Sequence, residues 1–532
     1  MSVDIINSSQ NTLTQMSYAT SVASENINNA SNPNYSRQVV EFSNNGAGVV
    51  VASPVRMSNS YLNQQVYETT SDVGYTSTVY QMANSVDTIV TGISVGPDGS
   101  SSNVLQQSLI EINEALINLV SDDSYASRSA VLSRVQTFID SATTMTAQLN
   151  AFEEQIEGEV IQTVKEINHT AKQIANVNEQ LLRNPNDVNL LTQRDELLND
   201  LSEHIAIDVH ENENGSVNVT VAGGYELVRG GKVNEIEVRY DEFGDIELYI
   251  QDIKISDNPE KLGGSLGGNL SAIEDVVKET ERMIGKMVVG LSAELNNANM
   301  EGFKADGSQG TPLVTIPDVP AKSSNQNTGD ATVSVGLDES NVSDLSEGPI
   351  IMTKTPAGYE FYDESTGETE VATSLPANVF GYEIDSPTGT MNDGDTFEID
   401  PLGDMLSGTE VTGEPDDIAA AGTLPVEEGD NSNLVNLSNV MSEPIFNDGQ
   451  DSVTAELANI FVEVGNNTVA AENNYKTAAS MNSAASANWA NYSGVSVQEE
   501  ELNIMQYQHV YQSVSKVINT VDDMFNALLD VV

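Results

Sequence analysis

The residue types that could carry metal or acid–base chemistry are few and scattered in this sequence. The four histidines are His169, His204, His210 and His509, and no His-Glu-x-x-His pattern places two of them on one helical turn. His204 and His210 stand on either side of a change from helical to alternating apolar spacing. A zinc site needs three or four converging ligands, so we expect these side chains to be structural or solvated.

A second candidate is a group of carboxylates near residue 400. Asp393, Asp395, Glu398 and Asp400 offer the oxygen ligands that Ca²⁺ prefers, but their spacing is not that of an EF-hand loop. The run GGSLGG at 263–268 lacks both the GxGxxG spacing and the Lys of a phosphate-binding loop. We interpret it as the turn that begins a helix. The sequence therefore predicts a protein that is not an enzyme, with no catalytic residue, cofactor or metal.

Composition restricts the class of partner. The chain has 21 Lys and Arg against 80 Asp and Glu, so its formal charge is 21 − 80 = −59. Nucleic acid and anionic membranes would be repelled. The acidic residues are dispersed along the chain, which favours a solvation role in salty surroundings, with an alkaline habitat as the other interpretation. The chain has no Cys, so it forms no disulfide.

The start of the chain and its apolar runs bear on localisation. MSVDIINSSQNTLTQM lacks the basic and apolar regions of a cleaved signal peptide. No run of about 18 apolar residues occurs, so membrane insertion is not expected. Export, if it occurs, would use a route without a cleaved signal peptide.

The elements that could position a functional surface are helices at the two chain ends. Apolar residues near the C-terminus are spaced alternately four and three apart, which predicts a coiled-coil seam. A weaker stripe of the same kind lies near the N-terminus. The N-terminal positions are Ile6, Leu13, Met16, Ala23 and Ile27, and the C-terminal positions are Tyr507, Val510, Val514, Val517, Val521, Met524 and Leu528. We predict that both stripes form a subunit interface.

Between the ends, helical and alternating patterns are nested. The predicted fold class is a multidomain α+β protein, in which N- and C-terminal helices pair in a coiled-coil rod and β-rich domains are inserted in the middle of the chain. The predicted segments are an N-terminal helix with an extended stretch (1–60), a long helical rod domain (61–205), a first β domain (206–265), a helical segment (266–305), an outer β-rich domain (306–430), returning helices of the rod (431–492) and a C-terminal coiled-coil helix (493–532). Hairpins are expected at Asn214-Gly215 and Phe243-Gly244.

Several motifs in this frame resemble those of a known family. SENINNASNPNYSRQ at 24–38 is similar to the signature of flagellar axial proteins, with Asn34 where the family has Gly; Asn tolerates positive φ. INHTAKQIANVNEQL at 167–181, VAGGYELVRG at 221–230, GDTFEIDP at 394–401 and SGVSVQEEELNIMQYQHVYQSVSKVINTVDDMFNALL at 493–529 resemble the flagellar hook-associated protein 1 family. The match extends over nearly the whole chain in the same order.

The resemblance implies a function. It suggests an extracellular structural protein of the bacterial flagellum that connects hook to filament, as a ring of copies polymerised through their terminal helices. The implied partners are the hook protein, hook-associated protein 3 and a flagellar export chaperone. The chaperone would bind the C-terminal helix through Val510, Tyr511, Val514, Val517, Ile518, Val521, Phe525 and Leu528.

One alternative from another class stays open at this point. The protein could be a secreted, acidic, adhesin-like binding module. In that case the β region at 306–430 would recognise a glycan or calcium, and the helices would present it.

Overall fold

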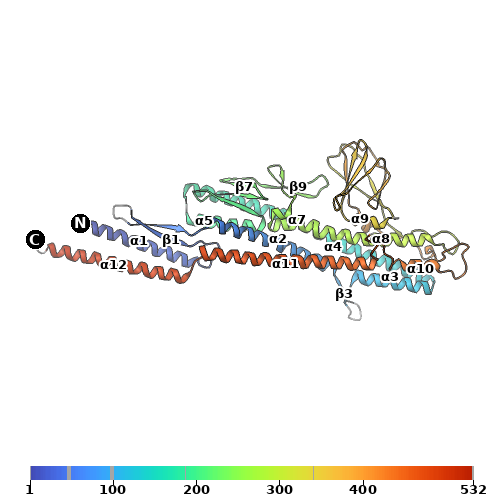
Figure 1. The fold of residues 1–532 in the computed structure, drawn as a ribbon, viewed down its shortest axis with the longest axis horizontal. Coiled ribbons are helices and arrows are strands. Elements are labelled where there is room, and N and C mark those ends of the chain that lie inside the picture. The colour runs from blue at the N-terminus through green and yellow to red at the C-terminus, as the bar shows by residue number, and fades with distance from the viewer. Residues whose placement is uncertain are drawn as a thin grey trace.

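The computed structural model describes residues 2–44, 50–95, 101–185, 187–339, 341–447 and 449–529. Figure 1 shows an elongated molecule whose helices follow its long axis, with two β-rich domains projecting from one side. The two chain ends lie together at one tip of the molecule, remote from the outer β domain. The predicted fold class, a multidomain α+β protein with paired terminal helices and inserted β domains, is confirmed.

Long helices form the body of the molecule. They are α2 (Ser60–Val90), α3 (Val104–Ser121), α4 (Tyr125–Arg183), α5 (Val188–His204) and α11 (Val453–Ser493). With 59 residues, α4 extends about 88 Å at the rise of an α-helix. Side-chain caps explain where these helices begin: Asn59, Asn103, Ser124, Asp187 and Ser452 each accept a backbone N–H of the first turn.

One continuous apolar core runs through this body. It joins buried residues of α2, α3, α4 and α11 with the helix α8 (Glu279–Glu301), and α2 runs alongside α11. The described part of the segment 431–492 contains two helices, since α10 (Ser432–Asn439) ends well before α11 begins. A short antiparallel pair, β3 (Ile93–Val95) and β4 (Ser101–Asn103), precedes α3.

The first β domain packs on the C-terminal half of α4. Its sheets contain β5 (Ile207–Glu211), β6 (Val217–Val221), β7 (Tyr225–Arg229) and β8 (Lys232–Val233) in one, and β9 (Ile236–Tyr240), β10 (Ile246–Ile250) and β11 (Ile253–Lys254) in the other. Both expected hairpins are present, with Gly215 at φ 82° and Gly244 at φ 99°. Inside the domain, the Asn178 side chain of α4 bonds to backbone atoms of Val217 and Gly230.

The run GGSLGG begins a helix, as the sequence predicted. After α6 (Pro259–Leu262), α7 (Gly264–Ala272) leads through a π-helical turn (Ile273–Lys278) into α8. A Cβ on Gly264 would lie 2.2 Å from the carbonyl carbon of His204, and one on Gly268 would lie 2.7 Å from the carbonyl oxygen of Tyr75. These glycines therefore permit close packing of α7 on α2 and α5.

The outer β domain is inserted between α8 and α10. Its strands are β12 (Val314–Thr315), β13 (Val319–Pro320), β14 (Lys322–Ser323), β15 (Ser334–Leu337), β16 (Ile350–Thr355), β17 (Gly358–Asp363), β18 (Thr369–Ala372), β19 (Ala377–Val379), β20 (Tyr382–Ile384), β21 (Thr396–Ile399) and β22 (Glu410–Val411), with α9 (Leu402–Gly408) before the last. They form a four-stranded sheet (β13-β15-β20-β19), a five-stranded sheet (β14-β21-β16-β17-β18) and the pair β12-β22. Their common core includes Val289 and Ala293 of α8 and Met405 of α9, which root the domain in the body.

Candidate assembly interface at the paired chain ends

The two terminal helices form one structural unit. Helices α1 (Ser2–Asn28) and α12 (Val497–Leu529) pack side by side and run in opposite directions, so that both chain ends reach the same tip (Figure 1). An antiparallel hairpin of β1 (Gln38–Asn44) and β2 (Val50–Arg56) lies against α1. We refer to α1, the hairpin and α12 as the terminal unit.

The inner seam of the terminal unit is built from small and medium side chains. Ala19 is fully buried and Val22 is 4% exposed, and they pack with Val40 of the hairpin and Tyr507 of α12. The Phe42 ring meets Tyr507 edge-on, with 6.1 Å between ring centroids. The small side chain of Ala19 lets the helix and the hairpin approach closely at this seam.

The residues predicted for the subunit interface and those predicted for the chaperone contact divide between two environments. Among the residues that face this seam, Met16 and Ala23 are buried and the remaining ones are half-buried. The half-buried residues are Ile6, Leu13, Ile27, Tyr507, Val510, Val514, Ile518 and Val521. Outside the seam, Val517 is 47%, Met524 62%, Phe525 51% and Tyr511 44% exposed. The side chain of Leu528 lies outside the described residues, although its backbone belongs to α12.

The signature segment after α1 forms a closed hydrogen-bond network. The fully buried Asn26 side chain donates to the Gln38 carbonyl at 2.8 Å and accepts from the Gln38 backbone N–H at 3.0 Å. Tyr35 Oη donates to Asn26 Oδ1 and accepts from Gln38 Nε2. Burial raises the pKa of Tyr35, while the bond from Gln38 works in the opposite direction. This network fixes the chain reversal from α1 into β1.

The turn inside this segment does not use a positive φ at Asn34. Among the described residues other than glycine, those with positive φ do not include Asn34. Instead, the Asn32 side chain accepts the backbone N–H of Asn34 at 3.0 Å, which is an Asx turn. The side chain two residues earlier thus shapes the turn where the family has Gly.

Arg37 joins the hairpin to the start of α12. Its Nε lies 2.6 Å from Glu500 Oε1 and its Nη1 2.7 Å from Glu499 Oε2. Both glutamates occupy the first turn of α12, where the helix dipole also favours negative charge. The backbone N–H of Arg37 donates to the Ser493 carbonyl at the end of α11. Arg37 is therefore held both by α12 and by the end of α11.

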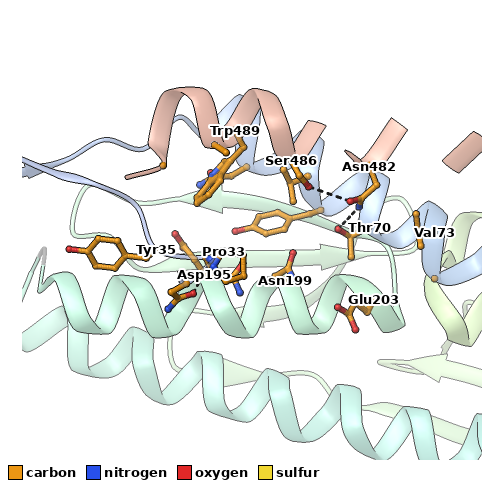
Figure 2. A pocket seen from close by; sticks show the side chains of 18 of the residues that line it. Pro33, Tyr35, Thr70, Val73, Asp195, Asn199, Glu203, Asn482, Ser486 and Trp489 are labelled. Carbon is orange, nitrogen blue, oxygen red and sulfur yellow. Dashed lines mark hydrogen bonds between the residues drawn. The ribbon is translucent and has the colours of Figure 1, made fainter. Parts of the chain in front are cut away.

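A cleft of about 830 Å³ lies where the terminal unit meets the body. The segment 29–35 forms one wall, and α2, α5 and α11 form the others (Figure 2). Trp489 Nε1 donates to Asn63 Oδ1 at 2.8 Å, and Asn482 bridges Thr70 and Ser486. Burial raises the pKa of Tyr67 well above its usual value. Amide and hydroxyl side chains thus share the lining of this cleft with apolar residues such as Val66, Val73 and Ala479.

The carboxylates near residue 400 have separate structural partners. Asp395 is 2% exposed and accepts bonds from backbone N–H groups of Thr328, Gly329 and Asn392. The bond from Asn392 is the main reason that the pKa of Asp395 is lowered. Each of the other carboxylates forms an ion pair with a different residue: Asp393 with Lys354, Glu398 with Lys322, and Asp400 with Arg282. Nothing in this arrangement supports the calcium-binding alternative.

The histidines also lie apart from one another. His169, His210 and His509 are exposed on different elements, and His204 Nδ1 lies 3.1 Å from Ser265 Oγ. Among the described residues, no group of three or more His, Asp or Glu side chains is arranged to hold a metal ion. In the same part of the chain, no helix is both long enough and apolar enough to cross a membrane.

Sequence reasoning missed part of this site. It did not single out Ala19 and Val22, whose small side chains carry little weight in an apolar count, although they continue the helical spacing of Met16 and Ala23. It also gave no role to Asn26 or Arg37. The signal was available in the motif itself, because an Asn at a helix end followed by Tyr, Arg and Gln supplies many bonding groups in a short segment.

These features define a class of protein: an elongated structural protein whose paired chain ends present apolar helical surface. Comparisons with known proteins agree. Residues 98–314 match the family model described as the flagellar hook-associated protein FlgK helical domain, and residues 487–531 match that of the flagellar basal body rod FlgEFG protein C-terminal. The chain is 26% identical over 576 residues to flagellar hook-associated protein 1 of Salmonella typhimurium, covering 99% of each chain.

Further relatives carry the same description. Flagellar hook-associated protein 1 of Escherichia coli K12 is 24% identical over 558 residues, covering 99% of both chains, and that of Bacillus subtilis is 22% identical over 549 residues, covering 96% of this chain and 95% of the relative. A solved structure of the flagellar hook junction protein FlgK from Burkholderia pseudomallei shares the fold. Its TM-score is 0.65 at 18% identity, over 80% of this chain and 98% of that one.

Over nearly its whole length the chain is thus similar to the flagellar hook-associated protein 1 family. It is accordingly a structural, hook-associated protein of the bacterial flagellum.

Proposed function

We propose that this protein joins the flagellar hook to the filament, as a ring of copies whose terminal units pack against one another. The observation that carries the proposal is the exposed outer half of the α12 stripe, where Val517, Met524 and Phe525 are 47%, 62% and 51% exposed. Contiguous exposed apolar residues commonly mark interaction sites. Covering them would contribute about 25 cal/mol per Å² of apolar area.

The inner half of the same stripe explains how one copy can prepare this surface. Val514 and Val521 face α1 within the chain, so α12 is ordered before a neighbour arrives. A preordered helix loses less conformational entropy on association. In this proposal segments 1–60 and 493–532 form the inner layer of a tube, segments 61–205, 266–305 and 431–492 the surrounding rod, and the β domains 206–265 and 306–430 lie outward.

The neighbouring partners follow from the family. The relatives are named hook-associated proteins, and we assign to this chain the hook protein on one side and hook-associated protein 3 on the other. We further propose that the protein acts outside the cell and reaches that place without a cleaved signal peptide. The N-terminal sequence of the secreted protein tests that point, because cleavage would remove Ser2 and the residues after it.

An export chaperone would use residues of α12 that α1 covers in the folded chain. Val510, Val514, Ile518 and Val521 are half-buried in the terminal unit, yet a groove that takes an amphipathic helix needs its apolar face. Chaperone binding and α1–α12 pairing therefore compete. Deleting residues 2–28 should strengthen binding of the chaperone to the chain, as measured by calorimetry; unchanged affinity would contradict the competition.

Substitutions on the outer stripe test the junction function. Met524→Asp places a charge on the proposed interface, leaves the inner seam intact and spares the residues assigned to the chaperone. Cells carrying only this variant should secrete it, grow hooks without filaments and release filament subunits into the medium. Gln512→Asp, on an exposed position of the same helix, is the matched control and should support full filaments. Full filaments on Met524→Asp would contradict the proposal.

A further inference from the structure

Packing between helices holds the terminal unit and the body together internally, but the connection between these two parts is of another kind. Extensive packing of helices lies within each of them, α1 on α12 in one and α2 on α11 in the other. Two short segments link them along the chain, 57–59 after the hairpin and 494–496 between α11 and α12. The cleft of about 830 Å³ lies at this junction. The extensive packing of elements that orders each part therefore does not continue across the junction.

A buried ion pair crosses the junction. Arg56 Nη2, at the end of the hairpin, lies 2.6 Å from Asp195 Oδ2 on α5, and the two side chains are 7% and 9% exposed. Asp195 Oδ1 accepts from Arg194 Nε at 2.9 Å and from Nη2 at 2.7 Å. The body thus holds the carboxylate in place before Arg56 reaches it. A charged bond between buried groups is directional and strongly position-dependent.

The body side of this pair is itself anchored. Arg194 Nη1 lies 2.7 Å from Glu211 Oε1 of β5 and also bonds to the Gly215 carbonyl. Burial lowers the pKa of Arg194, but the carboxylates of Asp195 and Glu211 outweigh this effect, so the pKa of Arg194 is raised. Across the junction, Arg56 Nε is buried without a hydrogen-bond partner within the described residues. The pair is rigid on the body side and incompletely satisfied on the side of the terminal unit.

Other contacts across the junction are weaker. Asn32 Nδ2 donates to Glu196 Oε1 at 2.9 Å in an exposed position, where water competes for both groups. The backbone bond from Arg37 to the Ser493 carbonyl lies next to the chain link and can act as a pivot. Arg56 lies opposite Gln38 in the hairpin, so Arg56 and Asp195 form a buried, charged contact directly beside that pivot.

We propose that Arg56 and Asp195 form a latch that fixes the angle between the terminal unit and the body. Closed, the latch holds the hairpin against α5. Open, it frees the terminal unit to swing about the segments 57–59 and 494–496, with the cleft as the space into which it moves. The latch is a property of the single chain, so it does not depend on the proposed role of the protein in joining hook to filament.

The absence of Cys from the sequence allows a direct test. Lys516→Cys on α12 and Met481→Cys on α11, both at exposed positions, take spin labels on either side of the junction in the full chain. Double electron–electron resonance should give one narrow distance distribution with Arg56 present. Arg56→Met should broaden or shift it, and Arg56→Lys, which keeps the charge without the planar fork, should give an intermediate width.

The control is Arg239→Met, which removes an arginine that pairs with Glu237 and Asp252 on the first β domain, away from the junction. It should leave the distribution narrow. Far-UV circular dichroism verifies that each variant is folded, and Arg56→Lys decides the question if Arg56→Met is not. A distribution as narrow as that of the parent in a folded Arg56 variant would overturn the latch.

Discussion

Helices α4 and α12 carry the same apolar rhythm but use it differently. In α4, Val135, Phe138 and Met145 are 3%, 1% and 7% exposed. In α12, Val517 and Met524 follow the same spacing and remain 47% and 62% exposed. The body thus completes its core within one chain, whereas the terminal unit completes only one side of its helix pair. Periodicity shows that a stripe will be covered, but not whether the cover comes from the same molecule.

The largest difference between these regions should appear in the stability of the single chain. Phe138→Ala removes a ring from the continuous core and should lower the free energy of unfolding by about 3–5 kcal/mol. Val517→Ala should change it by less than about 0.5 kcal/mol. Denaturant titration of both variants in monomeric protein checks this. Equal losses would show that the outer stripe is core after all.

The terminal unit has its own weak point in the signature network. Asn26→Ala leaves the buried bonding groups of Gln38 and Tyr35 without their partner, which should cost about 1–3 kcal/mol. Hydrogen exchange should quicken in α1 and β1 and stay unchanged in α4. Faster exchange in α4 as well would mean that the two regions unfold together, contrary to the division drawn here.

One pH effect should arise in the body, at Glu281 of α8. Burial, aided by Glu153, Asp400 and Asp404, raises the pKa of Glu281 from 4.5 to about 7, against a bond from Asn150. The folded state holds this proton more tightly than the unfolded state, so the stabilisation is present below about 4.5 and is lost as pH rises through about 7. Glu281→Gln should recover about 1–2 kcal/mol at pH 8 relative to pH 5, allowing for partial exposure.

The parallel titration of Glu281→Gln and the parent isolates this group from other raised carboxyls, such as Glu153 and Glu398. Hydrogen exchange of α12 should not respond to the substitution at either pH. An identical pH profile for parent and variant would show that Glu281 is not the titrating group.

Much of the architecture could be predicted from the sequence because local signals agreed with the fold. The Asn214-Gly215 turn, the long apolar stripe of α4 and the glycines before α7 each specify a local geometry. The position of the break between α10 and α11 was not predicted, since it depends on how that segment packs on the body. Resemblance to a family supplied the function, which spacing alone did not.

The site was harder to predict than the fold. The sequence identified the terminal stripe but not its division into a covered and an exposed side, because that division depends on where α1 lies along α12. The pairing of Arg56 with Asp195 could not be predicted for a similar reason: the two residues are 139 positions apart, and no local spacing shows that they meet. Residue pairs that meet only through tertiary contact produce no periodic pattern in the sequence.

The central claim is that the outer stripe of α12 is exposed in the single chain and covered in the assembly. Thiol labelling of Met524→Cys tests it most directly, in the monomer and in purified hook–filament complexes. The control is Val371→Cys, because Val371 lies on an edge strand of the outer domain and is 66% exposed. The account predicts fast labelling of Cys at position 524 in the monomer, strong protection in the complex, and fast labelling of the control in both. Equally fast labelling at position 524 in monomer and complex would contradict it.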